Sequence, residues 1–368
     1  MSQVAVTSPA EPGSRTENAM PDGRRHIRYL DGLRGIAILL VILVHTSLLV
    51  RGLPWPVRNL GFYGVRGVQL FFIVSGLTLT ISHRGKAFHL ANFAARRFFR
   101  IAPMFYLGAA FYVAWGYATQ FRFAPHPTWG EVLATITFVH GWLISGNSKV
   151  VPGGWSIAAE AMFYILFPIL LKLSTRPRRF ALVVLATYVV AGITYFALRR
   201  FLPGDPAIVR DFALKFWLCQ LPAFASGCWI AMGIGRSRLS RRNAGLLAAA
   251  AVAAMVVDSQ LRGQSNLLVS ILLLSIFVRA VTDARPAFLE GKILSLIGEI
   301  SFSLYILHFI VVRLLQLVAY PIEQALGWAP TFLLFYLTTL TVAGALAYAS
   351  FRWIETPFIR RGRNLFRH

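Results

Sequence analysis

The chain has 368 residues, of which 57% are hydrophobic and only 14% are charged. With a mean hydropathy of +0.61, this balance exceeds what one soluble core needs and predicts an all-α, polytopic integral membrane protein. The formal net charge of +23 would suggest a nucleic-acid partner for a soluble protein. Here, however, Lys and Arg cluster between apolar runs, where they orient helices and meet anionic lipid, so we expect no nucleic acid.

Residues 1–26 are rich in Ser, Pro, Gly and Glu and lack the basic, apolar and small-residue order of a cleavable signal. We expect a disordered cytoplasmic tail there. Residues 27–361 would form the transmembrane domain, and 362–368 a short basic cytoplasmic tail.

About ten segments are long and apolar enough to span a bilayer, which needs roughly 20 residues. They lie near 30–50, 62–82, 103–120, 155–173, 180–198, 213–234, 244–260, 265–282, 292–318 and 329–351.

The segment 131–145, EVLATITFVHGWLIS, is apolar but short, and it is either an eleventh span or a re-entrant or interfacial piece. With ten spans and a cytoplasmic N-terminus, most basic residues fall in cytoplasmic segments, as the positive-inside rule requires. A crossing at 131–145 would move the basic stretch KLSTRPRRF to the wrong side. We therefore predict that this segment does not cross and that both termini are cytoplasmic.

Arg34 and His45 lie within the first apolar segment, where ionisable side chains are costly and usually functional. At about 100° and 1.5 Å per residue, they share a helix face and are separated by roughly 16 Å. This suits a long ligand with an anionic head at Arg34 and a reactive end near His45. Alternatively, Arg34 extends to the interface and His45 satisfies a backbone carbonyl.

Two other ionisable residues lie in apolar helices. Glu160 follows the predicted start of its helix at Trp155 by about 8 Å, and His308 lies about 24 Å from Lys292 along a straight helix that also carries Ser301 and Tyr305 on the same face. His45, Glu160 and His308 are thus expected at a similar depth in the outer half of the bilayer. The alternative for each is a structural hydrogen bond between helices.

A basic cluster precedes the third segment. Arg97 and Arg100 are spaced i, i+3 and share a face, and arginine forks suit phosphate. The alternative is a topology signal or a lipid-headgroup contact. Cys219 and Cys228 have neither metal-ligand nor disulfide spacing, and we expect no metal site.

Six stretches, in order, resemble the signatures of the acyltransferase-3 family of bacterial integral-membrane O-acyltransferases. They are LDGLRGIAILLVILVH, FFIVSG, RRFFRIAP, WSIAAEAMFYILFP, GEISFSLYILH and ETPFIR. The resemblance implies multi-pass insertion in the bacterial inner (plasma) membrane. Family members often have two adjacent glutamates in the fourth motif, whereas here Glu160 is followed by Ala161, which argues against a mechanism that needs both carboxylates.

The resemblance implies transfer of an acyl group, for which we expect acetyl, from cytosolic acyl-CoA (acetyl-CoA) to a hydroxyl of a surface or exported carbohydrate or glycolipid. Arg34, Arg97 and Arg100 would bind the donor, which is a substrate and not a permanent cofactor. His45 would act as general base, oriented by Glu160 or His308, or would carry the acyl group transiently. Alternatives are an acyltransferase for a small molecule or with a succinyl donor, and a transporter or flippase of a glycan intermediate, against which the lack of repeated halves argues.

Overall fold

The computed structural model describes residues 28–119, 126–144, 146–174, 176–234, 239–262 and 266–365. The predicted tail 1–26 and the last three residues of the predicted tail 362–368 lie outside these residues. All regular structure in the described ranges is helical, which confirms the predicted all-α class. The last helix runs across the predicted domain boundary at 361 and ends at Asn364.

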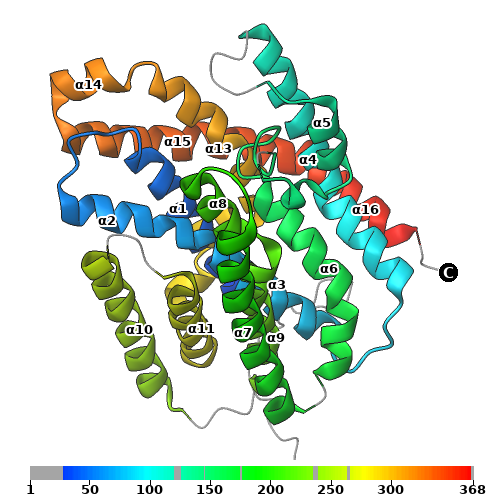
Figure 1. Ribbon diagram of the computed structural model, residues 1–368. Coiled ribbons are helices and arrows are strands. Elements are labelled where there is room, and N and C mark those ends of the chain that lie inside the picture. Colours follow the sequence, from blue (N-terminus) through cyan, green and yellow to red (C-terminus); the bar gives the residue numbers. More distant parts are fainter. Residues whose placement is uncertain are drawn as a thin grey trace, which may run out of the picture.

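The helices follow the chain order shown in Figure 1. Their bounds are α1 Arg28–Ser47, α2 Trp55–Tyr63, α3 Gly67–His83, α4 Leu90–Ala118, α5 Trp129–Ile136, α6 Trp155–Leu173, α7 Pro177–Phe201, α8 Pro206–Lys215, α9 Trp217–Gly233, α10 Arg241–Arg262, α11 Leu267–Ala284, α12 Lys292–Glu299, α13 Ser301–Gln316, α14 Ala319–Leu326, α15 Trp328–Ser350 and α16 Thr356–Asn364.

Eight of the described helices or continuous helix runs are long and apolar enough to cross a membrane, and the bent pair α12 and α13 would make nine. The eight are α1, α2 with α3, α4, α6, α7, α10, α11, and α15 with α16. The predicted segment 213–234 forms α9, which has only 17 residues and is buried along most of its length. The polytopic membrane class is therefore confirmed, although α9 is shorter than a usual span.

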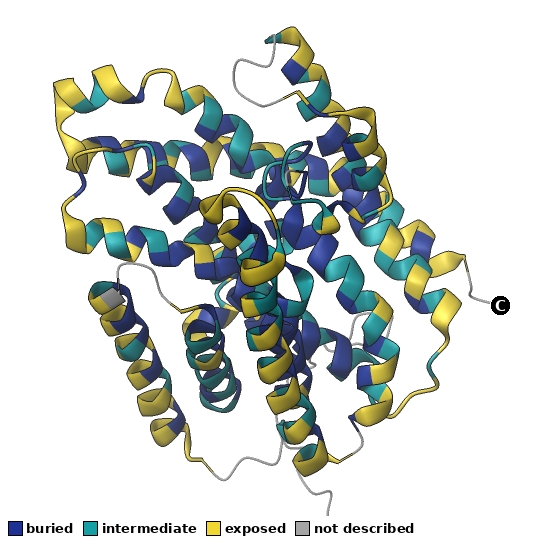
Figure 2. Ribbon diagram, viewed as in Figure 1, coloured by how far each residue is buried: buried dark blue, intermediate teal, exposed yellow. Residues whose placement is uncertain are grey.

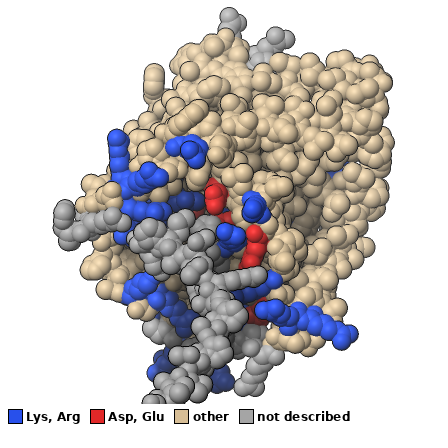
Figure 3. All heavy atoms as spheres, turned by 180° about the vertical axis from the view of Figure 1, so that it is seen from behind, with Lys and Arg blue, Asp and Glu red and all other residues tan. Residues whose placement is uncertain are grey.

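Residues exposed on the outer helices are largely apolar, whereas the centre of the bundle is buried (Figure 2). Leu182 and Ile193 on α7 are each at least 64% exposed. Such a surface suits lipid, which is as apolar as these side chains. Lys and Arg gather over the lower part of the face in Figure 3, around a few acidic residues, while its upper part is nearly free of charge. This uneven charge is what the positive-inside rule requires, and the side that is cytoplasmic stays a prediction.

Helix α1 lies at the centre, packed against α3, α12, α13 and α15, and α3 in turn packs along α9 (Figure 1). Two glycines let α3 and α9 touch through their backbones. A Cβ on Gly227 would overlap the carbonyl oxygen of Ile73, and one on Gly76 would overlap that of Phe224. Small residues at helix crossings in membranes permit this close approach.

We expect Gly227→Ala to lower the melting temperature of the protein in detergent, because overpacking costs about 1–3 kcal/mol. Gly344→Ala on α15 is the matched control, since a Cβ there meets open space. That control should keep or raise the melting temperature, because alanine favours a helix by about 1 kcal/mol over glycine. Equal melting temperatures for the two variants would contradict the tight crossing.

The predicted straight helix over 292–318 is wrong. Helices α12 and α13 meet at an angle of 78° around Ile300. The bend follows the contact of α12 with α1, where a Cβ on Gly298 would overlap the carbonyl oxygen of Asp31. The depth of His308 counted along a straight helix from Lys292 therefore does not apply.

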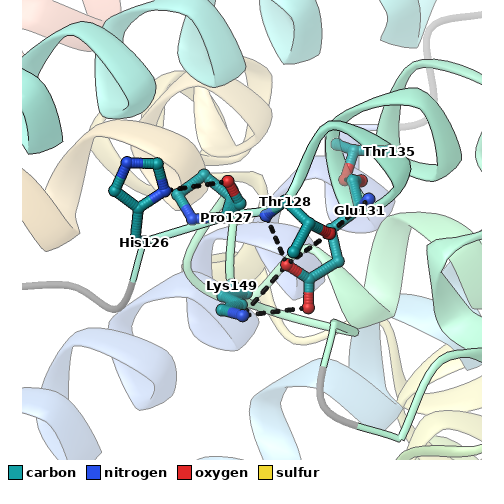
Figure 4. A network of polar contacts seen from close by, with 6 residues as sticks. All are labelled: His126, Pro127, Thr128, Glu131, Thr135 and Lys149. Carbon is teal, nitrogen blue, oxygen red and sulfur yellow. Dashed lines mark hydrogen bonds and ion pairs between the residues drawn. The ribbon is translucent and has the colours of Figure 1, made fainter.

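The segment 131–145 contains no described helix long enough to cross, as predicted. It begins in α5, which has 8 residues, and continues as a single 3-10 turn over His140–Trp142. Thr128 and Glu131 form a capping box at the start of α5, and Lys149 bonds to the Glu131 carboxylate at 3.0 Å (Figure 4). Partial burial would raise the pKa of Glu131, but hydrogen bonds from Thr128 and Lys149 outweigh it and hold the pKa below 4.5.

We expect Lys149→Ala to speed amide hydrogen exchange in α5 about fivefold, because a charged hydrogen bond worth roughly 1 kcal/mol is lost. Hydrogen-exchange mass spectrometry would measure this, with the exposed Lys172→Ala as control. In the wild type, the protection of the α5 amides against hydrogen exchange should be full above pH 4.5 and be lost as the pH falls through the lowered pKa of Glu131. Unchanged hydrogen exchange in Lys149→Ala would contradict the view that this ion pair stabilises α5.

Candidate functional site

Two imidazoles from distant parts of the chain meet inside the bundle. The ring centroids of His45, near the end of α1, and His308, in α13, are 5.3 Å apart. Phe309 packs on both rings, with centroid distances of 4.5 Å and 4.1 Å. The sequence separates these histidines by most of the chain, and the packing of α13 against α1 brings them together.

The hydrogen bonding of His308 fixes its tautomer when the ring is neutral. Its Nδ1 lies 3.1 Å from the carbonyl oxygen of Leu304, which can only accept, so Nδ1 carries the hydrogen. Nε2 is then left with a lone pair. It is buried and has no hydrogen-bond partner among the described residues. The pair thus contains a free basic nitrogen in a site shielded from solvent.

The three predicted arginines line one small cavity of about 90 Å³. Arg34 enters from α1, and Arg97 and Arg100 enter from α4 on a shared face, as their spacing predicts. Arg34 is held by an ion pair of 2.8 Å to Asp31 and by a bond of 3.0 Å to Thr78, and 20% of its side chain is exposed. It therefore faces the cavity from a fixed position.

Arg97 retains unused hydrogen-bonding capacity. Its guanidinium lies over the Tyr164 ring at 5.8 Å, and its Nε is buried without a hydrogen-bond partner in the described chain. A buried donor of a charged group is costly unless it is satisfied. This donor is available to an anionic ligand in the cavity.

Glu160 lies with the arginines and not with the histidines. Its carboxylate accepts hydrogen bonds from Ser75 at 2.9 Å and Tyr164 at 2.7 Å, and it lines the same cavity as Arg34. Within the described ranges, its bonds run to these two hydroxyls and to neither imidazole. The structure thus brings His45 to His308 and brings Glu160 to Arg34, Arg97 and Arg100.

Tyr305 connects the two groups. It lines the arginine cavity, and its ring lies 5.8 Å from that of His308. The Tyr305 hydroxyl donates to the carbonyl oxygen of Gly153 and accepts from Ser156, both at 2.9 Å. Gly153 adopts a φ of 75°, a conformation that favours glycine, at the turn that starts α6.

A second, larger cavity of about 780 Å³ lies near the end of α1. Its wall includes Val44, next to His45, and Trp155, next to the Ser156 of the arginine cavity. Trp155 is only 7% exposed, whereas Trp129 and Trp142 are 80% and 51% exposed. Of these three tryptophans, Trp155 faces the interior and the other two lie at the surface.

Several residues of the site were not predicted. Asp31, Ser75, Thr78 and Tyr164 hold the arginines and Glu160 in place. All but Thr78 lie inside the quoted motifs, as polar residues among apolar ones. That contrast was the signal that could have found them.

Comparison with known proteins finds relatives among bacterial O-acetyltransferases. Peptidoglycan O-acetyltransferase OatA of Listeria monocytogenes is 26% identical over 92% of this chain and 57% of its own length. O-acetyltransferase OatA of Staphylococcus aureus is 24% identical over 93% of this chain and 58% of its own length. The chain thus spans less than two thirds of these relatives. Exopolysaccharide production protein ExoZ of Rhizobium meliloti is 27% identical over 82% of this chain and 91% of its own length.

No solved structure matches the chain. The family model described as an acyltransferase domain matches residues 27–348, which include the arginine cavity and the histidine pair. By this match, and in agreement with the ordered motifs, the chain belongs to the acyltransferase-3 family.

Proposed function

We propose that the protein is a membrane O-acyltransferase that moves an acetyl group from acetyl-CoA to a hydroxyl of an exported carbohydrate or glycolipid. The observation that carries the proposal is the pair of His45 and His308 inside the bundle, next to Tyr305, which contacts the His308 ring and lines the cavity that holds three arginines. The family, and its relatives named as O-acetyltransferases OatA, support the reaction class.

Donor binding is assigned to the arginine cavity. Arg97 and Arg100 would pair with phosphate, the role that arginine forks serve best. A cavity of about 90 Å³ admits only part of coenzyme A, so the nucleotide would lie outside it, beyond the arginines. The narrow pantetheine arm would then extend past Tyr305 toward the histidines. With cytoplasmic termini, as the basic segments favour, this mouth would face the cytosol of a bacterial inner membrane.

The chemistry requires a base near the acceptor hydroxyl. A neutral imidazole of the pair would take the hydroxyl proton as the oxygen attacks the thioester carbonyl. The tetrahedral intermediate then expels the coenzyme A thiolate, to which the imidazolium returns the proton. The products are an acetyl ester and free coenzyme A, and no further reactant is needed. His45 would be this base, with His308 orienting it.

Glu160 would act on the donor side. Since its carboxylate is fixed by Ser75 and Tyr164 beside the arginines, it would hold the guanidinium groups in place, in contrast to the triad role expected from the sequence. Its loss should therefore weaken donor binding less than the loss of Arg97 does.

Purified protein in nanodiscs, given radiolabelled acetyl-CoA and the exported glycans of its own bacterium, tests the proposal. We expect labelled glycan ester and free coenzyme A in equal amounts. A parallel reaction with succinyl-CoA tests donor choice. A transporter or flippase would yield neither product, and that result would overturn the proposal.

A further inference from the structure

The larger cavity combines three kinds of side chain that bind sugars. It lies at the end of the bundle where α1, α7 and α10 end and α6, α9 and α11 begin (Figure 1). Aromatic rings of Trp155, Tyr195 and Phe196 line it and offer faces on which sugar rings stack. Its volume of about 780 Å³ is that of a ligand pocket, for which about 300–1,000 Å³ is usual.

An amide at the base of this cavity has an unused acceptor. Gln69 is 2% exposed, and its Nε2 donates to Gln220 Oε1 at 2.9 Å. Its Oε1 is buried and has no hydrogen-bond partner in the described part of the chain. Because a buried carbonyl oxygen is costly when unsatisfied, it is suited to accept from a ligand hydroxyl.

Positive charge exceeds negative charge on the described wall. Arg66, Arg210 and Lys215 line the cavity, and Asp211 is the acidic residue among the lining side chains. Lys215 bonds to Asp211 at 2.6 Å, and the negative charge of Asp258 acts on Arg66. Arg199, at the end of α7, lies over the ring of Tyr195 at 5.6 Å and adds a further cation beside the cavity.

The cavity is next to the proposed base. Val44 lines the cavity and directly precedes His45 on α1. A ligand in this cavity would therefore lie beside the turn of α1 that carries the proposed base, and this cavity shares no lining residue with the arginine cavity.

We infer that this cavity binds the acceptor and selects a glycan that carries an anionic group, either a carboxylate or a phosphate. The inference rests on the proposed O-acyltransferase function. Aromatic faces hold the sugar rings, Gln69 accepts from a hydroxyl, and Arg210 with Lys215 attracts the anionic group.

A first experiment compares the bacterium with and without a functional gene. Surface and exported glycans are separated by anion exchange, and their O-acetyl esters are measured. In the bacterium without a functional gene, we expect O-acetyl esters to disappear from the anionic fraction. Loss from the neutral fraction alone overturns the inference but leaves the proposed function intact, and loss from neither overturns the proposed function itself.

A second experiment uses the purified protein with labelled acetyl-CoA and the unacetylated anionic fraction from the deletion strain. One portion of this fraction is carboxyl-reduced and another is dephosphorylated. If labelled acetyl transfer to one of the two treated portions is at least tenfold lower than to the untreated fraction, the inference is supported and the anion is identified. Equal transfer to both treated portions and to the untreated fraction overturns it.

Variants link the selection to this cavity. Lys215→Gln and Arg210→Gln should each raise the acceptor KM about tenfold, which corresponds to roughly 1.4 kcal/mol. Arg200→Gln is the matched control, because Arg200 is an exposed residue that stacks on Phe201 and does not line the cavity. If the three variants have the same acceptor KM, the cavity does not recognise the anion.

Discussion

The His45→Ala variant is expected to lose at least 100-fold in acetyl transfer, since a positioned general base contributes about 10²–10⁴-fold. The His45 ring packs at a tilt against Phe309, and its centroid lies 5.3 Å from that of His308, so its removal also deprives His308 of its neighbour. Initial rates of labelled ester formation by purified protein would measure the loss, at equal amounts of folded protein judged by size-exclusion chromatography.

Two comparisons sharpen this test. His89→Ala removes an exposed imidazole just before α4 and should leave the rate unchanged. His308→Gln should retain more activity than His45→Ala if His308 orients the base, and less if the free Nε2 of His308 is itself the base. Full activity in His45→Ala would refute the role of the pair.

Arg97→Ala is expected to raise the KM for acetyl-CoA by about 10- to 100-fold, because a hydrogen bond between charged groups contributes roughly 1.5–3 kcal/mol. The buried Nε of Arg97 has no partner in the described chain, so the donor would be the group that satisfies it. Titration of acetyl-CoA at saturating acceptor gives the KM, while kcat should change little.

The control is Arg96→Ala, the neighbouring arginine that does not line the cavity. Glu160→Ala should raise the donor KM by less than Arg97→Ala does, because Glu160 bonds to Ser75 and Tyr164. An equal effect of Arg97→Ala and Glu160→Ala would argue against phosphate binding at these arginines.

Much of the fold could be predicted from local sequence patterns. The apolar runs predicted the helices because a bilayer allows only internally hydrogen-bonded segments to span it. The i, i+3 spacing of Arg97 and Arg100 predicted a shared helix face, since helical periodicity is a local property, and both residues line one cavity. The bend between α12 and α13 could not be predicted in this way, because it accompanies the tertiary contact of Gly298 with Asp31.

The grouping of site residues depended on such contacts too. The predicted depth in the bilayer grouped Glu160 with the histidines. Residues at the same depth can still point toward different parts of a helix bundle. The hydroxyls of Ser75 and Tyr164 determine where the carboxylate points, and they come from two different helices. The sequence predicted that His45 and His308 lie at a similar depth, and their ring centroids are 5.3 Å apart. The straight helix from which the depth of His308 was calculated is nevertheless wrong.

The residues between the two cavities would also form a permeability barrier. Trp155 lines one cavity and Ser156 the other, and Tyr305 bonds to Ser156. If the cavities face opposite sides of a bilayer, the side chains between them separate two aqueous compartments. The packed rings of His45, His308 and Phe309 would then have to keep ions and protons from crossing while they let an acetyl group pass.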